Sequence, residues 1–251
     1  MMKISIITAT FNSEKSLCYS LDSLFNQDYK NIECIIIDGD SKDSTLGIIK
    51  KYQSNYNNIH LVSEPDEGIY DALNKGLDLA SGDIIGFLHS DDILSETTII
   101  SKIVTEFNNK SIDGVYGDLC YVDKQDTSKI IRNWRSCQFE QDLLKQGWMP
   151  AHPTLFLRKE VYEKHGSFNL SYKIAADYDF MIRILKDTSL IFFYLSEVIT
   201  KMRVGGASKR SLKNVVQKSK EDYRVVITNK IGGFITVFKK NTSKLKQFKL
   251  F

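Results

Sequence analysis

The sequence predicts an α/β protein with a Rossmann-like, mostly parallel central sheet flanked by helices. Through the first 92 residues, short apolar runs rich in β-branched residues alternate with amphipathic segments of helical spacing. This alternation is typical of parallel sheets that helices cover. With 251 residues, of which 42% are hydrophobic and 26% charged, the chain can form one large domain of this class and a small appendage.

The first half of the chain carries the clearest elements. Its expected strands are short, apolar and bounded by turn residues, and they cover residues 3–8, 32–37, 60–62 and 83–88. The segments between them show helical periodicity, with Ser13 as a candidate N-cap, and we expect helices over 13–25, 43–56 and 69–79.

The pattern is less regular beyond residue 92. We expect helices over 97–107, 159–165 and from 180 onward, and strands over 114–122, 154–157, 190–195 and 198–204. A polar excursion or hairpin is expected over 123–135. A basic helix is expected over 208–230, followed by a break at Gly232-Gly233.

Polar side chains collect where the predicted parallel strands end. Ligands of such sheets bind beyond the carboxyl ends of the strands, so four polar groups in succession favour a shared site. The groups are Thr8, Thr10 and Asn12; Asp38, Asp40 and Ser41; Glu64, Asp66 and Glu67; and Asp91 with Asp92.

Asp91 and Asp92 end the buried run 83–88 and raise a question of charge. Adjacent carboxylates at such a position are unfavourable unless a cation neutralises them. A divalent metal held by one or two carboxylates, with water and phosphate oxygens completing its shell, would do so. Alternatively, Asp92 caps a helix that begins near Ser95.

Two familiar nucleotide motifs are missing from the sequence. No Gly-x-Gly-x-x-Gly follows the first strand, which counts against a dinucleotide cofactor, and no P-loop pattern occurs anywhere in the chain. The remaining interpretation is a nucleotide site built on carboxylates and a metal.

Charge is distributed unevenly along the chain. Residues 201–251 hold 14 lysines and arginines but two acidic residues, Glu221 and Asp222, whereas the rest of the chain is acidic. A basic tail favours contact with an anionic surface such as a membrane or nucleic acid. Four scattered cysteines, and a first strand without a basic leader, lead us to expect a cytoplasmic protein with free thiols and no signal peptide.

Four segments in order carry a family resemblance: residues 5–12 (SIITATFN), 37–45 (IDGDSKDST), 63–76 (SEPDEGIYDALNKG) and 82–92 (GDIIGFLHSDD). Over residues 3–205 the sequence resembles the family 2 glycosyltransferases of bacterial polysaccharide or O-antigen biosynthesis, which have the type A glycosyltransferase fold. The resemblance implies a catalytic domain over 1–205, with a nucleotide-binding half (1–92) and an acceptor-binding half (93–205). A basic helical extension would follow over 206–251.

The resemblance also implies roles for individual residues. Asp92, with Asp91, would hold Mn²⁺ or Mg²⁺, and Asp177 would be the general base. Asp38 would accept a hydrogen bond from the nucleotide base. The implied donor-binding residues are Thr8, Ala9, Thr10, Asn12, Asp38, Asp66, Lys75, Asp91 and Arg203. The implied acceptor-side residues are His152 and Asp179, and Asp179 is also the competitor of Asp177 as base. His89 has no assigned role.

The implied reaction is inverting transfer of a hexosyl or N-acetylhexosaminyl group from a nucleoside diphosphate sugar, UDP-linked, to a saccharide. The acceptor would be free or linked to polyprenyl diphosphate at the inner face of the membrane. Phe234, Ile235, Val237 and Phe238 beside Lys239, Lys240, Lys244 and Lys246 would form an interfacial anchor there. The acidic site argues against nucleic acid as a partner. A sugar-nucleotide pyrophosphorylase-like enzyme and a non-catalytic sugar-nucleotide binder are the alternatives.

Overall fold

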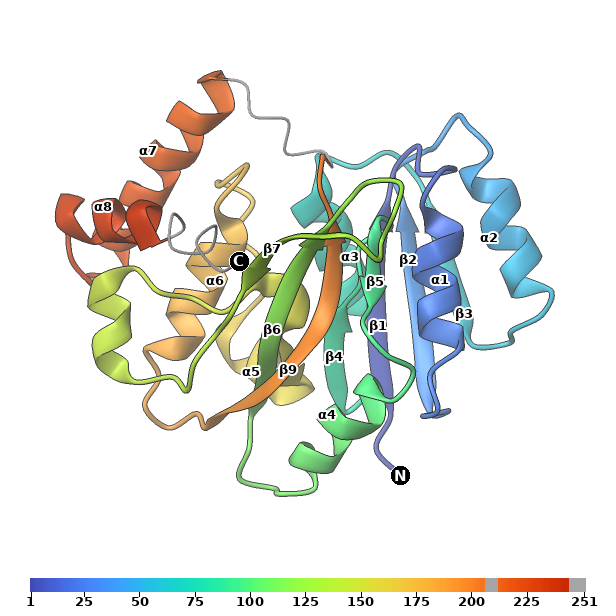
Figure 1. Cartoon of the computed structure of the whole chain (residues 1–251), viewed down its shortest axis with the longest axis horizontal. Helices are drawn as coiled ribbons and strands as arrows, with labels where there is room; N and C mark the ends of the chain where they lie inside the picture. Colours follow the sequence, from blue (N-terminus) through green and yellow to red (C-terminus); the bar gives the residue numbers. More distant parts are fainter. Residues whose placement is uncertain (206–211, 244–251) are drawn as a thin grey trace.

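The computed structural model describes residues 1–205 and 212–243 (Figure 1). The first half alternates strands and helices as the sequence predicts. The strands are β1 (Ile4–Thr10), β2 (Ile32–Asp38), β3 (Ile59–Ser63) and β4 (Ile84–Phe87). The helices between them are α1 (Leu17–Phe25), α2 (Thr45–Gln53) and α3 (Ile69–Leu79). These four strands are mutually parallel, in the order β3-β2-β1-β4.

The second half extends this sheet with strands of mixed direction. They are β5 (Asp92–Leu94), β6 (Gly114–Val122), β7 (Ile130–Trp134), β8 (Phe156–Arg158) and β9 (Phe192–Arg203). The full order is β3-β2-β1-β4-β8-β6-β9-β5, with β7 paired to β6. Strand β8 runs antiparallel to both β4 and β6, while β9 is parallel to β6. The predicted α/β class with a mostly parallel central sheet is confirmed.

Helices cover both faces of the sheet because successive side chains of a strand point to opposite faces. Ile4 and Ile6 of β1 pack in one core with α1, α2 and α4 (Ile99–Phe107). Ile7 and Ala9 pack in the other core with α3, α5 (Lys159–His165) and α6 (Ala176–Leu185). Alternation along one strand therefore divides the interior into two layers.

Three details differ from the sequence predictions. Helix α1 begins at Leu17 with Ser16 as its N-cap residue, so the expected N-cap at Ser13 is wrong. Asp92 begins strand β5, which pairs with β9, and α4 begins only at Ile99, so the helix-cap interpretation of Asp92 is wrong. The two strands expected over 190–204 are one strand, β9, whose pairing with β6 shifts register near Asp118. The shift lets one strand continue through a polar stretch that resembles a turn in the sequence.

The C-terminal extension is helical where the structure describes it. It contains α7 (Leu212–Thr228) and α8 (Phe234–Ser243); residues 206–211 and 244–251 lie outside the described part. Helix α7 contacts α6, and α8 contacts α7 and the 3₁₀ segment η1 (Gln141–Gln146), so the extension packs beside α6 (Figure 1). No helix in residues 1–205 or 212–243 is long and apolar enough to cross a membrane. The domain division at residues 92 and 205 stays a prediction.

Candidate active site

The carboxyl ends of β1, β2 and β4 lie side by side, which places three of the polar groups at one edge of the sheet. Thr10 of β1 is in register with Asp38 of β2, and Gly39 donates a backbone hydrogen bond to the Thr10 carbonyl at 2.9 Å. Thr8, Ala9 and Thr10 are buried. Within the described part of the chain, neither threonine hydroxyl has a hydrogen-bond partner, so both are buried and unsatisfied.

Asn12 and Asp38 shape the loops above these strands. Asn12 has a left-handed backbone (φ 47°), donates its N–H to Ser41 Oγ at 2.8 Å and accepts from the Lys42 N–H at 2.9 Å. The Asp38 carboxylate is fully buried and accepts hydrogen bonds from the Ser41 N–H, Ser41 Oγ and Ser63 Oγ. These hydrogen bonds hold the loop that follows β2 in place. The contact of Asp38 with a nucleotide base stays a prediction.

A surface hollow opens above this loop. Its lining residues come from three loops at the strand ends: Phe11, Gly39, Asp40, Lys42, Pro65, Asp66 and Gly68. Asp66 accepts the Gly68 N–H at 2.8 Å. A Cβ at Gly39 would lie 2.5 Å from Asp66 Oδ2, so the glycine allows the two loops to approach each other.

Lys75 fixes the far side of this hollow from α3. Its ammonium group lies 2.7 Å from Glu64 and 3.4 Å from Asp71, and it donates to the Pro65 carbonyl at 3.2 Å. The lysine therefore holds the loop that carries Asp66.

Asp92 is the most unusual group at this edge. Its side chain is 0% exposed, and among the described residues neither carboxylate oxygen has a hydrogen-bond partner. Burial raises the pKa of Asp92 well above its usual range, Asp91 adds to the rise, and Arg203 opposes it. A buried, partnerless carboxylate is unfavourable on its own, and a bound cation would relieve it.

Arg203 complements this carboxylate from the end of β9. It stacks on the Tyr19 ring at 4.6 Å and donates Nη1 to the Lys124 carbonyl at 2.7 Å. Its buried Nε and Nη2 have no hydrogen-bond partner within the described residues. A cation and an anion, each short of partners, thus lie near each other without an ion pair between them in the part of the chain described.

These groups are compatible with a divalent metal. The two oxygens of Asp92, which lack partners in the described part of the chain, and the half-buried Asp91 beside it would supply carboxylate ligands of the type that Mg²⁺ and Mn²⁺ prefer. The described residues contain no cluster of three or more His, Cys, Asp or Glu placed to hold a metal. An ion here would therefore depend on ligand and water oxygens for the rest of its shell.

Asp177, in the first turn of α6, lies near the turn that carries Asp91. It is half-buried and accepts hydrogen bonds at Oδ1 from the Tyr70 hydroxyl at 3.2 Å and from the Tyr178 N–H at 2.7 Å. Within the described residues no hydrogen bond reaches Oδ2, which leaves that oxygen able to accept a proton. Tyr70, which sequence reasoning missed, lies 107 residues away along the chain.

Two uncharged histidine side chains, His152 and His89, lie near Asp177. His152 is buried between Phe87 and Phe168, with ring centroids 4.9 and 5.4 Å away. Burial lowers the pKa of His152 to about 4, although Asp177 opposes the shift. Burial also lowers the pKa of His89, against Asp91 and Asp177, and the two imidazole rings lie 6.1 Å apart. Asp177 therefore lies near the Asp91 turn and beside uncharged histidines.

Asp179 lies apart from this group. It is buried, pairs with Arg183 at 3.0 Å and accepts a hydrogen bond from Asn229 at 3.1 Å. Its carboxylate is directed to packing between α6 and α7. A role for Asp179 toward an acceptor stays a prediction.

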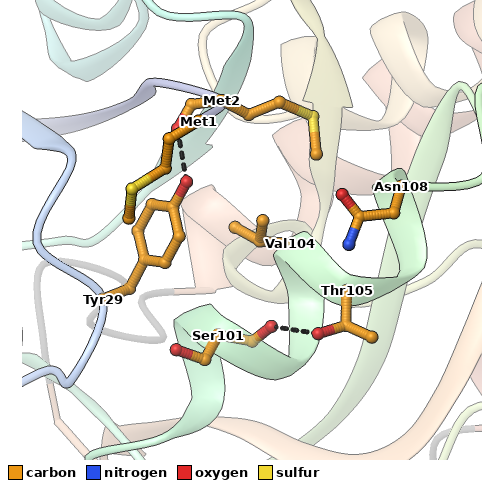
Figure 2. Close-up of a pocket in the computed structure, with 7 residues that line it drawn as sticks. All are labelled: Met1, Met2, Tyr29, Ser101, Val104, Thr105 and Asn108. Carbon is orange, nitrogen blue, oxygen red and sulfur yellow. Dashed lines mark hydrogen bonds between the residues drawn. The ribbon is translucent and has the colours of Figure 1, made fainter.

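A second hollow lies at the opposite end of the sheet, before β1 (Figure 2). It is lined by Met1, Met2, Tyr29, Ser101, Val104, Thr105 and Asn108. The Tyr29 hydroxyl donates to the Met2 carbonyl at 2.5 Å, and Thr105 bonds back to the Ser101 carbonyl at 2.8 Å. Of the lining side chains in the described part of the chain, the Tyr29 phenol is the one that ionises, and no carboxylate, imidazole or basic side chain is among them.

Comparison with known proteins decides the family. The profile described as "Glycosyl transferase family 2" matches residues 5–166. The chain belongs to this family. This family 2 glycosyltransferase is 31% identical over 235 residues to a "PGL/p-HBAD biosynthesis glycosyltransferase" of Mycobacterium bovis (strain BCG / Pasteur 1173P2). The match covers 89% of this chain and 88% of the relative. It is 27% identical over 246 residues to an "Uncharacterized glycosyltransferase" of Haemophilus influenzae, covering 91% and 75%.

Solved structures identify the type A glycosyltransferase fold. S. aureus TarS superposes with a TM-score of 0.68 at 19% identity, covering 98% of this chain and 43% of TarS, so this glycosyltransferase spans less than half of that protein. A mannosyltransferase from Pyrobaculum calidifontis, in complex with GDP-Man and Mn²⁺, gives 0.68 at 16% identity, covering 95% and 69%. Membership in the family favours a transferase over the pyrophosphorylase-like and non-catalytic alternatives.

Proposed function

We propose that this glycosyltransferase moves a hexosyl or N-acetylhexosaminyl group from a UDP-linked donor to a hydroxyl of a lipid-linked saccharide in cell-surface polysaccharide synthesis. The observation that carries the proposal is that two carboxylates in different surroundings, Asp92 and Asp177, both lie near Asp91 and His89. Asp92 is buried and has no hydrogen-bond partner in residues 1–205 and 212–243, whereas Asp177 is half-buried and contacts the Tyr70 hydroxyl. In many active sites, two carboxylates in different surroundings have different duties: one stabilises charge and the other transfers a proton.

The donor would lie across the strand ends. Its base and ribose would occupy the hollow beside Asp66, with Thr8, Ala9, Thr10 and Asn12 along the wall. TarS has been solved with UDP and with UDP-GlcNAc, which supports a uridine donor in a shared fold. Arg203 Nε and Nη2 have no hydrogen-bond partner among the residues that the structure describes, and arginine suits phosphate oxygens by its fork geometry.

Asp177 would remove the proton from the acceptor hydroxyl as that oxygen attacks the anomeric carbon. The bond from that carbon to the diphosphate oxygen breaks in the same step, and the configuration inverts. A Mn²⁺ or Mg²⁺ ion held by Asp92 and Asp91 would supply positive charge where the leaving diphosphate gains negative charge. The neutral, buried His152 would line the acceptor side and exclude water from it.

A screen of nucleotide sugars tests this proposal. We expect release of UDP, dependent on Mn²⁺ or Mg²⁺, from at least one UDP-sugar, and about tenfold or more slower release from GDP- and TDP-sugars. Product analysis by NMR should show an inverted anomeric centre. Release of pyrophosphate from UTP and a sugar phosphate would instead identify a pyrophosphorylase.

The extension would dock on an anionic membrane at the inner face, in the cytoplasm. Helix α8 exposes Phe234 (73%), Ile235 (69%) and Phe238 (59%) with Lys239 beside them. Two residues of the expected anchor are corrected here: Val237 and Lys240 are buried, and Lys240 pairs with Asp222 at 2.7 Å. Lys244 and Lys246 lie outside the described residues. Exposed aromatics beside basic residues favour an interfacial helix.

Vesicle co-sedimentation tests this docking. Replacing Phe234, Ile235 and Phe238 together by serine should weaken binding to phosphatidylglycerol vesicles about tenfold or more, because their apolar area no longer enters the interface. Leu170→Ser, which changes an equally apolar residue that is 47% exposed outside the extension, is the matched control. Unchanged co-sedimentation of the triple variant would remove the membrane proposal.

A further inference from the structure

Two acidic residues of the C-terminal extension are directed at α6, the helix that carries Asp177. Residues 201–251 contain only Glu221 and Asp222 as acids. Both lie on α7 and both act at α6: Glu221 binds the backbone that precedes it, and Asp222 binds Lys240, whose ammonium lies 3.0 Å from the centroid of the Tyr178 ring. In this otherwise basic segment the two adjacent acidic residues are both directed at α6, and their contacts there call for a physical explanation.

Glu221 caps the entrance to α6. Its carboxylate accepts the N–H groups of Lys173 at 3.2 Å, Ile174 at 2.8 Å and Ala175 at 3.0 Å. The helix begins at Ala176, and its own N-cap residue, Ala175, has no side chain able to accept a hydrogen bond. A carboxylate brought from another helix thus accepts three N–H groups of the segment that leads into α6, and it lies near the positive end of the helix dipole.

The Glu221 carboxylate is itself held in place. Gln217, one turn earlier on α7, donates to its Oε1 at 3.0 Å. Burial works against the charge, but the bonds from Ile174, Gln217, Ala175 and Lys173 outweigh it and lower the pKa of Glu221 below its usual range. The side chain is therefore an ionised, oriented acceptor at neutral pH.

The capped segment is two residues from Asp177 and shares a partner with it. The Tyr70 hydroxyl contacts the Ile174 carbonyl at 2.8 Å and Asp177 Oδ1 at 3.2 Å. Ile174 is thus held at its N–H by Glu221 and at its carbonyl by Tyr70. A shift of this residue would move both the first turn of α6 and the hydroxyl that orients Asp177.

We propose that Glu221 is a positioning residue for Asp177, so that α7 of the basic extension is part of the catalytic unit and not only an attachment. The inference rests on the proposed role of Asp177 as base. It concerns the placement of that carboxylate and leaves donor binding to the strand-end loops.

Turnover and amide hydrogen exchange of Glu221→Ala and Glu221→Gln test the inference. We expect Glu221→Ala to lower kcat about 10–100-fold on the most active UDP-sugar, because small misplacement of a reacting group has effects of this size. Its KM for that donor and its affinity for UDP should stay within about twofold, and exchange at the Ile174 and Ala175 amides should accelerate. Glu221→Gln keeps one oxygen acceptor and should recover most of the turnover.

Glu163→Ala, which removes an exposed glutamate from α5, is the control and should change nothing. In an Asp177→Asn background, Glu221→Ala should lower the residual rate no further, since it acts through Asp177. Normal kcat in Glu221→Ala beside an inactive Asp177→Asn would overturn the positioning role alone. An active Asp177→Asn would instead remove the proposed base, while accelerated exchange would still report the cap.

Discussion

Replacing Asp92 with asparagine is expected to lower sugar transfer about 100-fold or more while leaving the protein at least as stable to heat. Metal-supplied charge contributes several kcal/mol to such reactions, and each 1.36 kcal/mol is about tenfold in rate. The carboxylate is 0% exposed and has no hydrogen-bond partner in the described residues, so a neutral amide of the same shape removes an unfavourable buried charge from the metal-free protein. Loss of activity without loss of stability identifies a residue retained for function.

Turnover with Mn²⁺ and thermal unfolding in EDTA measure the two parts of this prediction. Asp78→Asn, which changes an exposed aspartate on α3, is the matched control and should leave both values unchanged. If Asp92→Asn unfolds at a markedly lower temperature, the carboxylate has a structural partner and the metal assignment is wrong.

Asp177→Asn should lower turnover by about 10²–10⁴-fold, the usual contribution of a general base, and should keep donor affinity. The amide oxygen can still accept the Tyr178 N–H, so the first turn of α6 is preserved. Steady-state kinetics with the best UDP-sugar, and UDP affinity measured separately, check the two halves of this expectation.

Asp179→Asn distinguishes the two candidate bases. Its carboxylate pairs with Arg183 and Asn229, so we expect about 1–3 kcal/mol lower stability and a much smaller loss of turnover than in Asp177→Asn. Loss of turnover at unchanged stability would move the base assignment to Asp179.

Local pattern was sufficient for much of the fold. The strands of the first half are short β-branched runs, and their parallel arrangement follows from the helices between them. The pattern failed where pairing was non-local. Asp92 belongs to a three-residue strand that exists because β9, more than 100 residues later, lies beside it, and no local periodicity encodes such a partner.

In the candidate site too, some contacts could be predicted from the sequence and others could not. Thr10 and Asp38 meet because parallel strands end at one edge, which sequence order predicts. The opposite duties of Asp177 and Asp179 depend on Tyr70, Arg183 and Asn229, which approach from α3, from α6 itself and from the segment after α7. The Asp179–Arg183 pair is four residues apart on one helix, whereas Tyr70 and Asn229 are distant in the chain and become partners only once the helices are packed.

Calorimetric titration of UDP with Mn²⁺ tests the central claim most directly. The account predicts that the wild-type protein and Asp177→Asn bind UDP with similar affinity, that binding weakens at least about tenfold in EDTA, and that Asp92→Asn shows this weak binding even with Mn²⁺. Absence of UDP binding to the wild-type protein, or equal binding by all three proteins with and without Mn²⁺, would contradict it.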